Sequence, residues 1–213
     1  DFPPLKRTLQ AVEEKFGHLL SRMQWINFGG GHHITRPGYQ IDELAACIRD
    51  FAQKYGVQVY LEPGEAVAIG TGVLVTEVRA TKQQGANHFV MVDAGFSDLV
   101  RPALYGAYHG MELIHSDGTA VNGLQFDTVV AGPLCESGDV FTQGDGGVVL
   151  HRSLPQAQVG DLLVLHDTGA YGASMSSNYN ARPLIAEVLM ENGEPRLIRR
   201  RQTVAELLAL EAV

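Results

Sequence analysis

The sequence predicts an α/β segment followed by an all-β domain. In the first part, apolar residues recur at three- and four-residue spacing in two stretches, and a short strand follows each, which is typical of a βαβ unit with parallel strands. From Val73 onward, short β-branched runs alternate with Gly, Asp and Asn, the pattern of an antiparallel sandwich or barrel. We therefore expect two domains, residues 1–72 and 73–213.

The α/β segment contains two predicted helices and two predicted strands. The first helix covers residues 4–23, and its apolar face consists of Leu5, Leu9, Val12, Phe16, Leu19 and Met23. A strand at 25–28 runs into a glycine triplet, a second helix ends at Gly56, and a strand follows at 57–61. Because the loops after the strands share one face of a barrel, the triplet and residues 62–65 should be neighbours.

The all-β domain contains short predicted strands and two clear local signals. The strands are expected at 73–78, 88–92, 128–131, 148–150, 162–165 and 183–190. Asn192 and Gly193 predict a tight hairpin turn, since both residues tolerate left-handed backbone conformations. Thr203 and Glu206 have the spacing of a capping box, which predicts a closing helix.

Composition and charge exclude several classes of protein. The chain is 45% hydrophobic and 19% charged, as in globular proteins, and its net charge of −8 disfavours nucleic acid as a partner. The basic run at 199–201 is expected to be a solvated strand end. No apolar stretch has the length of a membrane span, so we expect no membrane partner and a cytoplasmic location. The chain opens on Asp1 without a methionine, which suggests a fragment.

Two cysteines are present, and they have different settings. Cys47 lies among apolar residues of the second helix and is expected to be a buried, inert thiol. With no Cys-x-x-Cys spacing, reduced thiols are favoured over a zinc site. The adjacent His32 and His33 are likewise expected to pack or to line a cofactor, with no metal bound.

Cys135 begins a run that is costly in an ordinary β-domain. It is followed by Glu136, Ser137, Gly138 and Asp139, so a thiol stands beside two carboxylates. Their negative charge should keep the proton on the sulfur, as a proton donor requires. About thirty residues later, a tyrosine stands between glycines in the sequence Gly-Ala-Tyr-Gly-Ala, and the run Ser-Ser-Asn-Tyr-Asn follows at 176–180. Both segments are predicted to belong to a functional site.

These segments resemble a known enzyme family. The runs 133–140, 92–96, 101–105 and 169–182 resemble bacterial diaminopimelate decarboxylases, and the likeness extends from about residue 80 to the C-terminus. That family uses pyridoxal 5'-phosphate (PLP) and has the alanine-racemase-like fold. The resemblance implies the C-terminal part of a PLP-binding (β/α)8 barrel at 1–72, followed by a β-sandwich or barrel domain at 73–213.

Residues 9–78 are more similar to a sister family, the carboxynorspermidine decarboxylases of polyamine biosynthesis. The likeness rests on the runs 29–37 and 61–66. Two halves that resemble two families indicate a natural or engineered chimera with a junction between Val73 and Lys82, and a single divergent ancestor is the alternative.

The diaminopimelate decarboxylase resemblance implies a reaction and a role for each site residue. The substrate would be meso-2,6-diaminopimelate and the product L-lysine, with Cys135 giving a proton to the α-carbon after carbon dioxide leaves. Glu136 would contact the distal amino group of the substrate, and Arg101 and Tyr105 its distal carboxylate. Tyr171 would touch both cofactor and substrate. The cofactor loops would comprise Gly29, Gly30, Gly31, Glu62, Pro63, Gly64 and Glu65, of which Glu65 would also face the substrate. Active sites in this family lie at a homodimer interface.

The sequence departs from the family in two places. Family members carry a lysine that forms the Schiff base with PLP and a His-Ile-Gly-Ser-like phosphate loop, and neither is found here. Glu65 stands where diaminopimelate decarboxylases have an arginine. We therefore expect this chain alone to be inactive, and two alternatives stay open: carboxynorspermidine decarboxylase, and a non-catalytic fragment that only binds cofactor.

Overall fold

The computed structural model describes residues 3–211, which divide into two compact units. The first unit is Asp1–Gly70 and the second is Thr71–Val213. Each unit has its own apolar core, so each is described by itself. No helix within residues 3–211 is both long and apolar enough to cross a bilayer.

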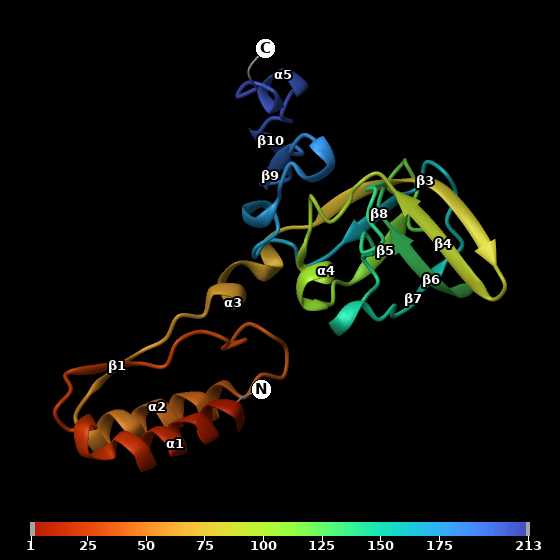
Figure 1. The fold of residues 1–213 in the computed structure, drawn as a ribbon. Helices are drawn as coiled ribbons and strands as arrows, with labels where there is room; N and C mark the ends of the chain where they lie inside the picture. The colour runs from red at the N-terminus through yellow and green to blue at the C-terminus, as the bar shows by residue number, and fades with distance from the viewer. Residues whose placement is uncertain (1–2, 212–213) are drawn as a thin grey trace. The chain divides into compact units, whose positions relative to one another are not determined.

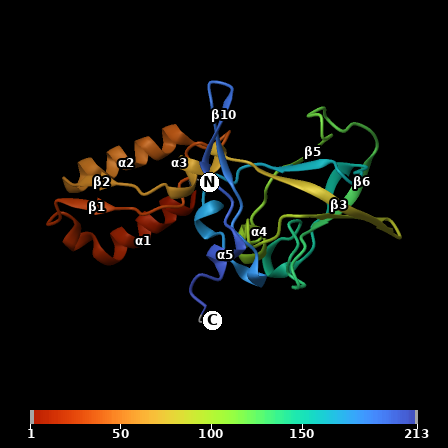
Figure 2. The same ribbon diagram turned by 90° about the horizontal axis from the view of Figure 1, so that it is seen from above.

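The first unit is a βαβ unit with an additional helix in front of it (Figure 1). Its elements are α1 (Pro3–Leu20), β1 (Trp25–Asn27), α2 (Ile41–Tyr55), β2 (Gln58–Tyr60) and α3 (Gly64–Ala68). The strands pair in parallel with Ile26 opposite Val59, which confirms the prediction. Figure 1 shows the two long helices side by side on one face of the strands, and in Figure 2 the strands run between the helix axes. Helix α2 ends at Gly56, whose φ of 67° only glycine adopts at little cost.

The core of this unit lies between the two helices and the strands. It contains Leu5, Leu9, Leu20, Leu44, Phe51 and Val57. Two members of the predicted apolar face are exposed instead, namely Phe16 and Met23. For Met23 the reason is that α1 ends at Leu20, so the residue lies in the following turn and off the helical face.

The second unit is built on a six-stranded sheet with the order β5-β8-β3-β4-β6-β7. The strands are β3 (Leu74–Gln84), β4 (Asn87–Val92), β5 (Met111–Ile114), β6 (Gln125–Ala131), β7 (Arg152–Pro155) and β8 (Leu162–Leu165). All pairs are antiparallel except β4 with β6. The outermost strands, β5 and β7, approach each other, so the sheet nearly closes, as Figure 1 shows. The nearly closed sheet confirms the prediction of a barrel-like β-domain.

Several details of the second unit differ from the prediction. Residues 148–150 form no strand, because only Val149 makes a single bridge, to Gln143. The predicted strand at 183–190 is reduced to β9 (Glu187–Glu191). Strands β5 and β7 and the short helix α4 (Arg101–Tyr105) were not predicted, since each has only four or five residues and little periodicity.

The C-terminal part follows its local sequence signals closely. Strands β9 and β10 (Glu194–Arg199) form a hairpin, and Asn192 and Gly193 at its turn have φ values of 53° and 85°. Two successive left-handed residues are what a type I′ turn requires. Helix α5 (Val204–Leu207) begins with a complete capping box between Thr203 and Glu206.

Candidate functional site

A loop that starts after β6 presents the Cys-Glu pair, and a buried carboxylate holds its shape. Asp139 is only 3% exposed, and its two oxygens accept the N–H groups of Leu134 at 2.8 Å and Phe96 at 2.7 Å. Burial raises the pKa of Asp139, while these two N–H groups lower it. A side chain on Gly132 would collide with this carboxylate, so the glycine is needed there. Asp139 therefore fixes the loop and joins it to the turn after β4.

Cys135 and Glu136 lie at the tip of this loop and are exposed. The N–H of Cys135 donates to Oδ1 of Asn180 at 2.7 Å. The Glu136 carboxylate accepts from the N–H of Gly138 and from the hydroxyl of Tyr179, each at 3.3 Å. These donors lower the pKa of Glu136, the Gly138 N–H most strongly. The loop thus offers a thiol next to a carboxylate that stays ionised, and an ionised carboxylate can bind an ammonium group.

The segment that faces this loop contains an unusual concentration of left-handed residues. Four residues other than glycine have positive φ there, namely Asp167, Tyr171, Asn180 and Ala181, with values between 54° and 60°. Such conformations cost free energy and persist where surrounding contacts impose them, often at functional sites. For Tyr171 the constraint is visible at its neighbour, because any side chain on Gly172 would overlap the Thr168 carbonyl.

Arg101 and Tyr171 form a second pair in the same unit. The guanidinium of Arg101 lies 5.7 Å from the centre of the Tyr171 ring, which is cation–π distance. Arg101 is buried at the start of α4, whereas Tyr105 at the end of this helix is 57% exposed. The structure brings Arg101 to Tyr171, and Cys135 and Glu136 to the 179–180 segment.

Backbone contacts tie these segments into one assembly. Arg182 Nη2 donates to the Asp93 carbonyl at 2.9 Å, and the Ser177 N–H donates to the Ser97 carbonyl at 2.8 Å. The ring of Phe96 lies 5.0 Å from that of Tyr179. The turn after β4, the Cys-Glu loop and residues 177–182 therefore meet.

In the first unit, the glycine triplet and the loop after β2 are adjacent. The Glu62 N–H donates to the Gly29 carbonyl at 2.8 Å, and the Asn27 side chain bridges the loops by donating to Glu62 at 2.6 Å and accepting from the Gly29 N–H at 2.7 Å. Gly29 and Gly31 have φ values of 72° and 81°, and a Cβ on Gly30 would lie 2.7 Å from the Glu62 carbonyl oxygen. All three positions therefore require glycine.

This loop has the donor set of an anion site. Within residues 3–211, the N–H groups of Gly30 and Gly31 have no hydrogen-bond acceptor, and space lies open beside Gly29 and Gly31. Unpaired N–H groups in a glycine loop at the end of a parallel strand are typical of phosphate binding. The residues present therefore fit the phosphate of a cofactor such as PLP.

The remaining predicted residues of this unit lie at the start of α3. Pro63 precedes the helix, and Gly64 is its first residue. The Glu65 carboxylate lies 3.4 Å from Nδ1 of His33, so an ion pair forms when this histidine is protonated. His32 is buried. No group of three potential metal ligands occurs among the described residues.

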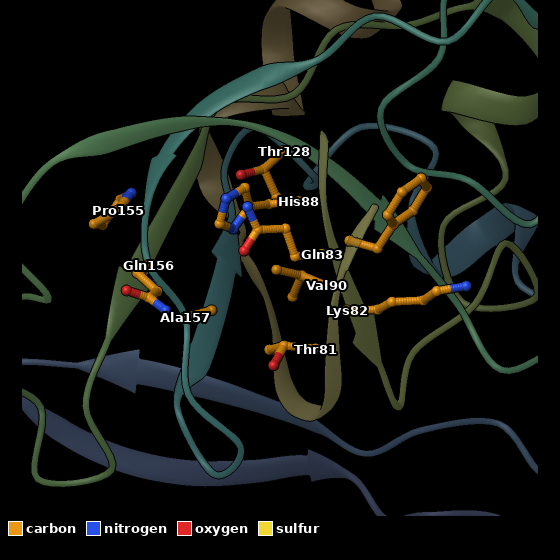
Figure 3. A pocket seen from close by; sticks show the side chains of 10 residues that line it. Thr81, Lys82, Gln83, His88, Val90, Thr128, Pro155, Gln156 and Ala157 are labelled. Atoms are coloured by element: carbon orange, nitrogen blue, oxygen red, sulfur yellow. The ribbon is translucent and has the colours of Figure 1, made fainter. Parts of the chain in front are cut away.

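Of two cavities in the second unit, neither is lined by Cys135 or Glu136. The larger, of about 730 Å³, is beside Asn180, Ala181 and Arg182 and is also lined by Asp93 and Asp98. The smaller, of about 100 Å³, is drawn in Figure 3 with Lys82, Gln83 and His88 around it. It lies near the turn of the β3–β4 hairpin, and none of its lining residues belongs to the predicted site. Cys135 and Glu136 are themselves exposed.

Sequence reasoning gave no role to the two residues that contact Cys135 and Glu136 most directly. Tyr179 and Asn180 stand 43 and 45 positions away from their partners, and neither distance follows from a local pattern. The one available signal is the composition of the 176–180 run, where Ser, Asn and Tyr follow a glycine-flanked tyrosine.

Comparisons with known proteins place the chain in a family. Residues 39–169 match the family described as pyridoxal-dependent decarboxylase, C-terminal sheet domain. The chain is 62% identical to the diaminopimelate decarboxylase of Escherichia coli K12, over 99% of this chain and 53% of that protein. It resembles a crystal structure of diaminopimelate decarboxylase with a TM-score of 0.83 and 49% identity, over 99% of this chain and 53% of that one.

A carboxynorspermidine decarboxylase of Campylobacter jejuni, solved with norspermidine, is also similar. Its TM-score is 0.76 with 29% identity, over 96% of this chain and 56% of that one. The chain spans about half the length of these relatives. Since one alignment to a diaminopimelate decarboxylase covers both units, a single ancestor accounts for the sequence without a junction between two families.

Proposed function

Because this chain belongs to the family of pyridoxal-dependent decarboxylases, we propose that it is part of a diaminopimelate decarboxylase, which converts meso-2,6-diaminopimelate to L-lysine. The observation that carries the proposal is the loop that presents Cys135 beside an ionised Glu136. This pair offers a transferable proton and an anionic contact for an ammonium group, and a decarboxylase acting on a diamino acid needs both.

When bound, the cofactor would supply an electron sink for the electron pair left by departing carbon dioxide. The chain's own residues then have separate tasks. Cys135 holds a proton on Sγ for the α-carbon, and Glu136 binds the distal ammonium of the substrate. Arg101 and Tyr105 bind the distal carboxylate, where an arginine can make two parallel hydrogen bonds. Tyr171, held in a left-handed conformation, would contact both cofactor and substrate.

The first unit would hold the cofactor. The open N–H groups of Gly30 and Gly31 suit a phosphate, and the loop of Glu62, Pro63, Gly64 and Glu65 lies against the triplet. Parallel strands followed by such loops are typical of the active face of a (β/α)8 barrel. We therefore propose that residues 1–72 are the last part of a PLP-binding barrel and that residues 73–213 are the β-domain of an alanine-racemase-like fold.

Assembly and location extend the proposal. An exposed Cys-Glu pair is what a site completed by another surface requires, and we propose that this surface belongs to the second subunit of a homodimer. Restored activity in mixed dimers between a subunit lacking Cys135 and one with an inactive cofactor site would support it. Mixed dimers without activity would contradict it.

A cytoplasmic location remains a prediction, which the two free thiols favour.

Glu65 favours a second candidate, carboxynorspermidine decarboxylase. A glutamate attracts the amines of that substrate, whereas the arginine of diaminopimelate decarboxylases would attract a carboxylate. The similarity to the Campylobacter jejuni enzyme supports this alternative. Arg101 and Tyr105, however, still offer a carboxylate site from the β-domain. A fragment that binds cofactor without catalysis is the third possibility.

The proposed function is tested by measuring kcat/KM of a full-length protein that contains this chain, on both amino acids. We expect carbon dioxide from meso-2,6-diaminopimelate with the higher kcat/KM. A preference for carboxynorspermidine would replace the proposal by the second candidate. Cofactor binding without turnover of either compound would favour the third.

A further inference from the structure

The loop from Leu134 to Val140 satisfies its backbone N–H groups mainly with its own atoms. Those of Leu134 and Gly138 donate to the Asp139 and Glu136 carboxylates, and those of Glu136, Asp139 and Val140 donate to carbonyls of the same loop. The N–H of Cys135 is different, because its acceptor is the side chain of Asn180. The backbone that carries the thiol is therefore positioned from outside the loop.

Asn180 has a backbone conformation that suits this contact. Its φ is 55°, and asparagine is among the few side chains that adopt the left-handed region readily. Its Oδ1 lies 2.7 Å from the Cys135 nitrogen, which is a short N–H···O bond. Left-handed geometry and an acceptor side chain are thus both needed at this position.

Tyr179, the preceding residue, contacts the second group of the loop. Its hydroxyl donates to Oε2 of Glu136 at 3.3 Å, while its ring lies 5.0 Å from that of Phe96. Proximity to Glu136 and burial raise the pKa of Tyr179, burial being the larger cause, so the hydroxyl keeps its proton and remains a donor. The ring contact and the hydrogen bond together fix the direction of the Glu136 carboxylate.

The segment that carries both residues is itself anchored. Asn178 Nδ2 donates to the Arg182 carbonyl at 2.8 Å and to Gln202 Oε1 at 2.6 Å. The Ser177 N–H donates to the Ser97 carbonyl. These contacts connect residues 177–182 to the turn after β4 and to the strand end before α5, so the segment is a firm support for the loop.

We propose that Tyr179 and Asn180 are a pair of positioning residues, in which Asn180 sets the direction of the Cys135 thiol and Tyr179 sets the direction of the Glu136 carboxylate. The roles of the thiol and carboxylate rest on the proposed function, whereas the positioning itself rests on the contacts. Two adjacent residues thereby control the proton donor and the ammonium contact separately.

The Asn180 half is tested in the 213-residue chain with Cys47→Ala, which leaves Cys135 as the one thiol. Asn180→Gly retains the left-handed conformation and removes the acceptor, whereas Asn180→Asp retains both. We expect hydrogen exchange at the Cys135 amide to accelerate about fivefold or more in the Gly variant and to stay within about twofold in the Asp variant. The rate of Cys135 alkylation by iodoacetamide should change in the Gly variant, whereas the Asp variant is compared by amide exchange alone, because its added charge also alters the reactivity of the thiol.

The amide of Val130, in the core of β6, is the internal control for folding, and its exchange should be unchanged. Equal exchange at Cys135 in the parent chain and in the Gly variant would overturn the Asn180 assignment. So would an equal acceleration in the Gly and Asp variants, since the side-chain acceptor would then have no role.

The Tyr179 half is tested with Tyr179→Phe, which keeps the ring on Phe96 and removes the hydroxyl. The carboxyl carbon of Glu136, followed by NMR across a pH titration, should report a higher pKa, because one of its donors is lost. An unchanged titration would overturn this half. The Cys135 amide should exchange as in the parent chain, and acceleration there would contradict the separate control of the two groups. Neither readout requires decarboxylation, so failure of the proposed function would leave both results interpretable.

Discussion

The glycine loop of the first unit and the Cys-Glu loop of the second are built in different ways. Gly29, Gly30 and Gly31 create their site through the backbone, by adopting conformations and a close approach that other residues cannot. Cys135 and Glu136 depend on side chains, namely Asp139 of the same loop and, from distant parts of the chain, Tyr179 and Asn180. A backbone site is visible in a local sequence, whereas a site held by distant side chains is visible only after folding.

The largest effect expected is complete loss of catalysis when the two loops are studied without the rest of a decarboxylase. We predict that the 213-residue chain mixed with PLP releases no carbon dioxide from diaminopimelate. Its lysines lack the sequence surroundings of the residue that attaches the cofactor in the family, so no covalent anchor is available. Release of labelled carbon dioxide that disappears after Cys135→Ala would contradict this prediction.

The second prediction concerns the stability of the Cys-Glu loop. Asp139→Ala removes a buried acceptor from two backbone N–H groups, and we expect it to lower the free energy of unfolding by about 3 kcal/mol. Asp127→Ala is the matched control, because Asp127 is exposed on β6, and its effect should stay within about 0.5 kcal/mol. Urea denaturation measures both variants, and equal effects would show that Asp139 does not hold the loop.

The same carboxylate predicts a pH dependence. Since the pKa of Asp139 is raised in the folded state, the folded protein binds the proton more tightly than the unfolded chain. Its contribution to stability is therefore most favourable at acid pH and decreases as pH rises from the ordinary aspartate range through the raised value. Asp139→Asn should remove this slope, as measured by the thermal midpoint against pH. If the slope is unchanged in that variant, the pH dependence of stability arises from other titratable groups.

The third prediction tests the backbone site. A methyl group on Gly30 would lie 2.7 Å from the Glu62 carbonyl oxygen, so Gly30→Ala must move one of the two loops. We expect a loss of about 1–3 kcal/mol in unfolding free energy. Gly70→Ala is the control, because space is open there and its effect should be within about 0.5 kcal/mol. Equal losses for both variants would show that the contact between the loops is not required.

The smallest effect expected is on specificity. If Glu65 faces the distal end of the substrate, Glu65→Arg in a full-length protein exchanges repulsion of a carboxylate for a charge-assisted hydrogen bond. Activity on diaminopimelate should rise about tenfold, equivalent to about 1.4 kcal/mol. Glu62→Gln in the adjacent loop serves as the comparison and should produce no such gain. A kcat/KM for Glu65→Arg that is unchanged or lower would mean that Glu65 does not face the substrate. Its contact with His33 would then be its main interaction.

The contrast between the loops also explains what could be predicted from the sequence. The βαβ unit, the end of α2 at Gly56, the turn at Asn192 and the capping box at Thr203 follow from local rules of periodicity and backbone conformation. Strands β5 and β7 were not predicted, because their pairing is decided by partners far along the chain. For the same reason Cys135 and Glu136 could be singled out by their chemistry, while Tyr179 and Asn180 needed the folded structure.

The central claim is that Cys135 supplies a proton to the reacting carbon of the substrate. The direct measurement is kcat and KM for diaminopimelate with Cys135→Ala in a full-length protein, alongside Cys47→Ala as the control for loss of a thiol. The account predicts that kcat falls by roughly 10²–10⁴ with little change in KM for Cys135→Ala, as expected for a general acid, and that Cys47→Ala retains its activity. A kcat for Cys135→Ala equal to that of the parent protein would contradict it.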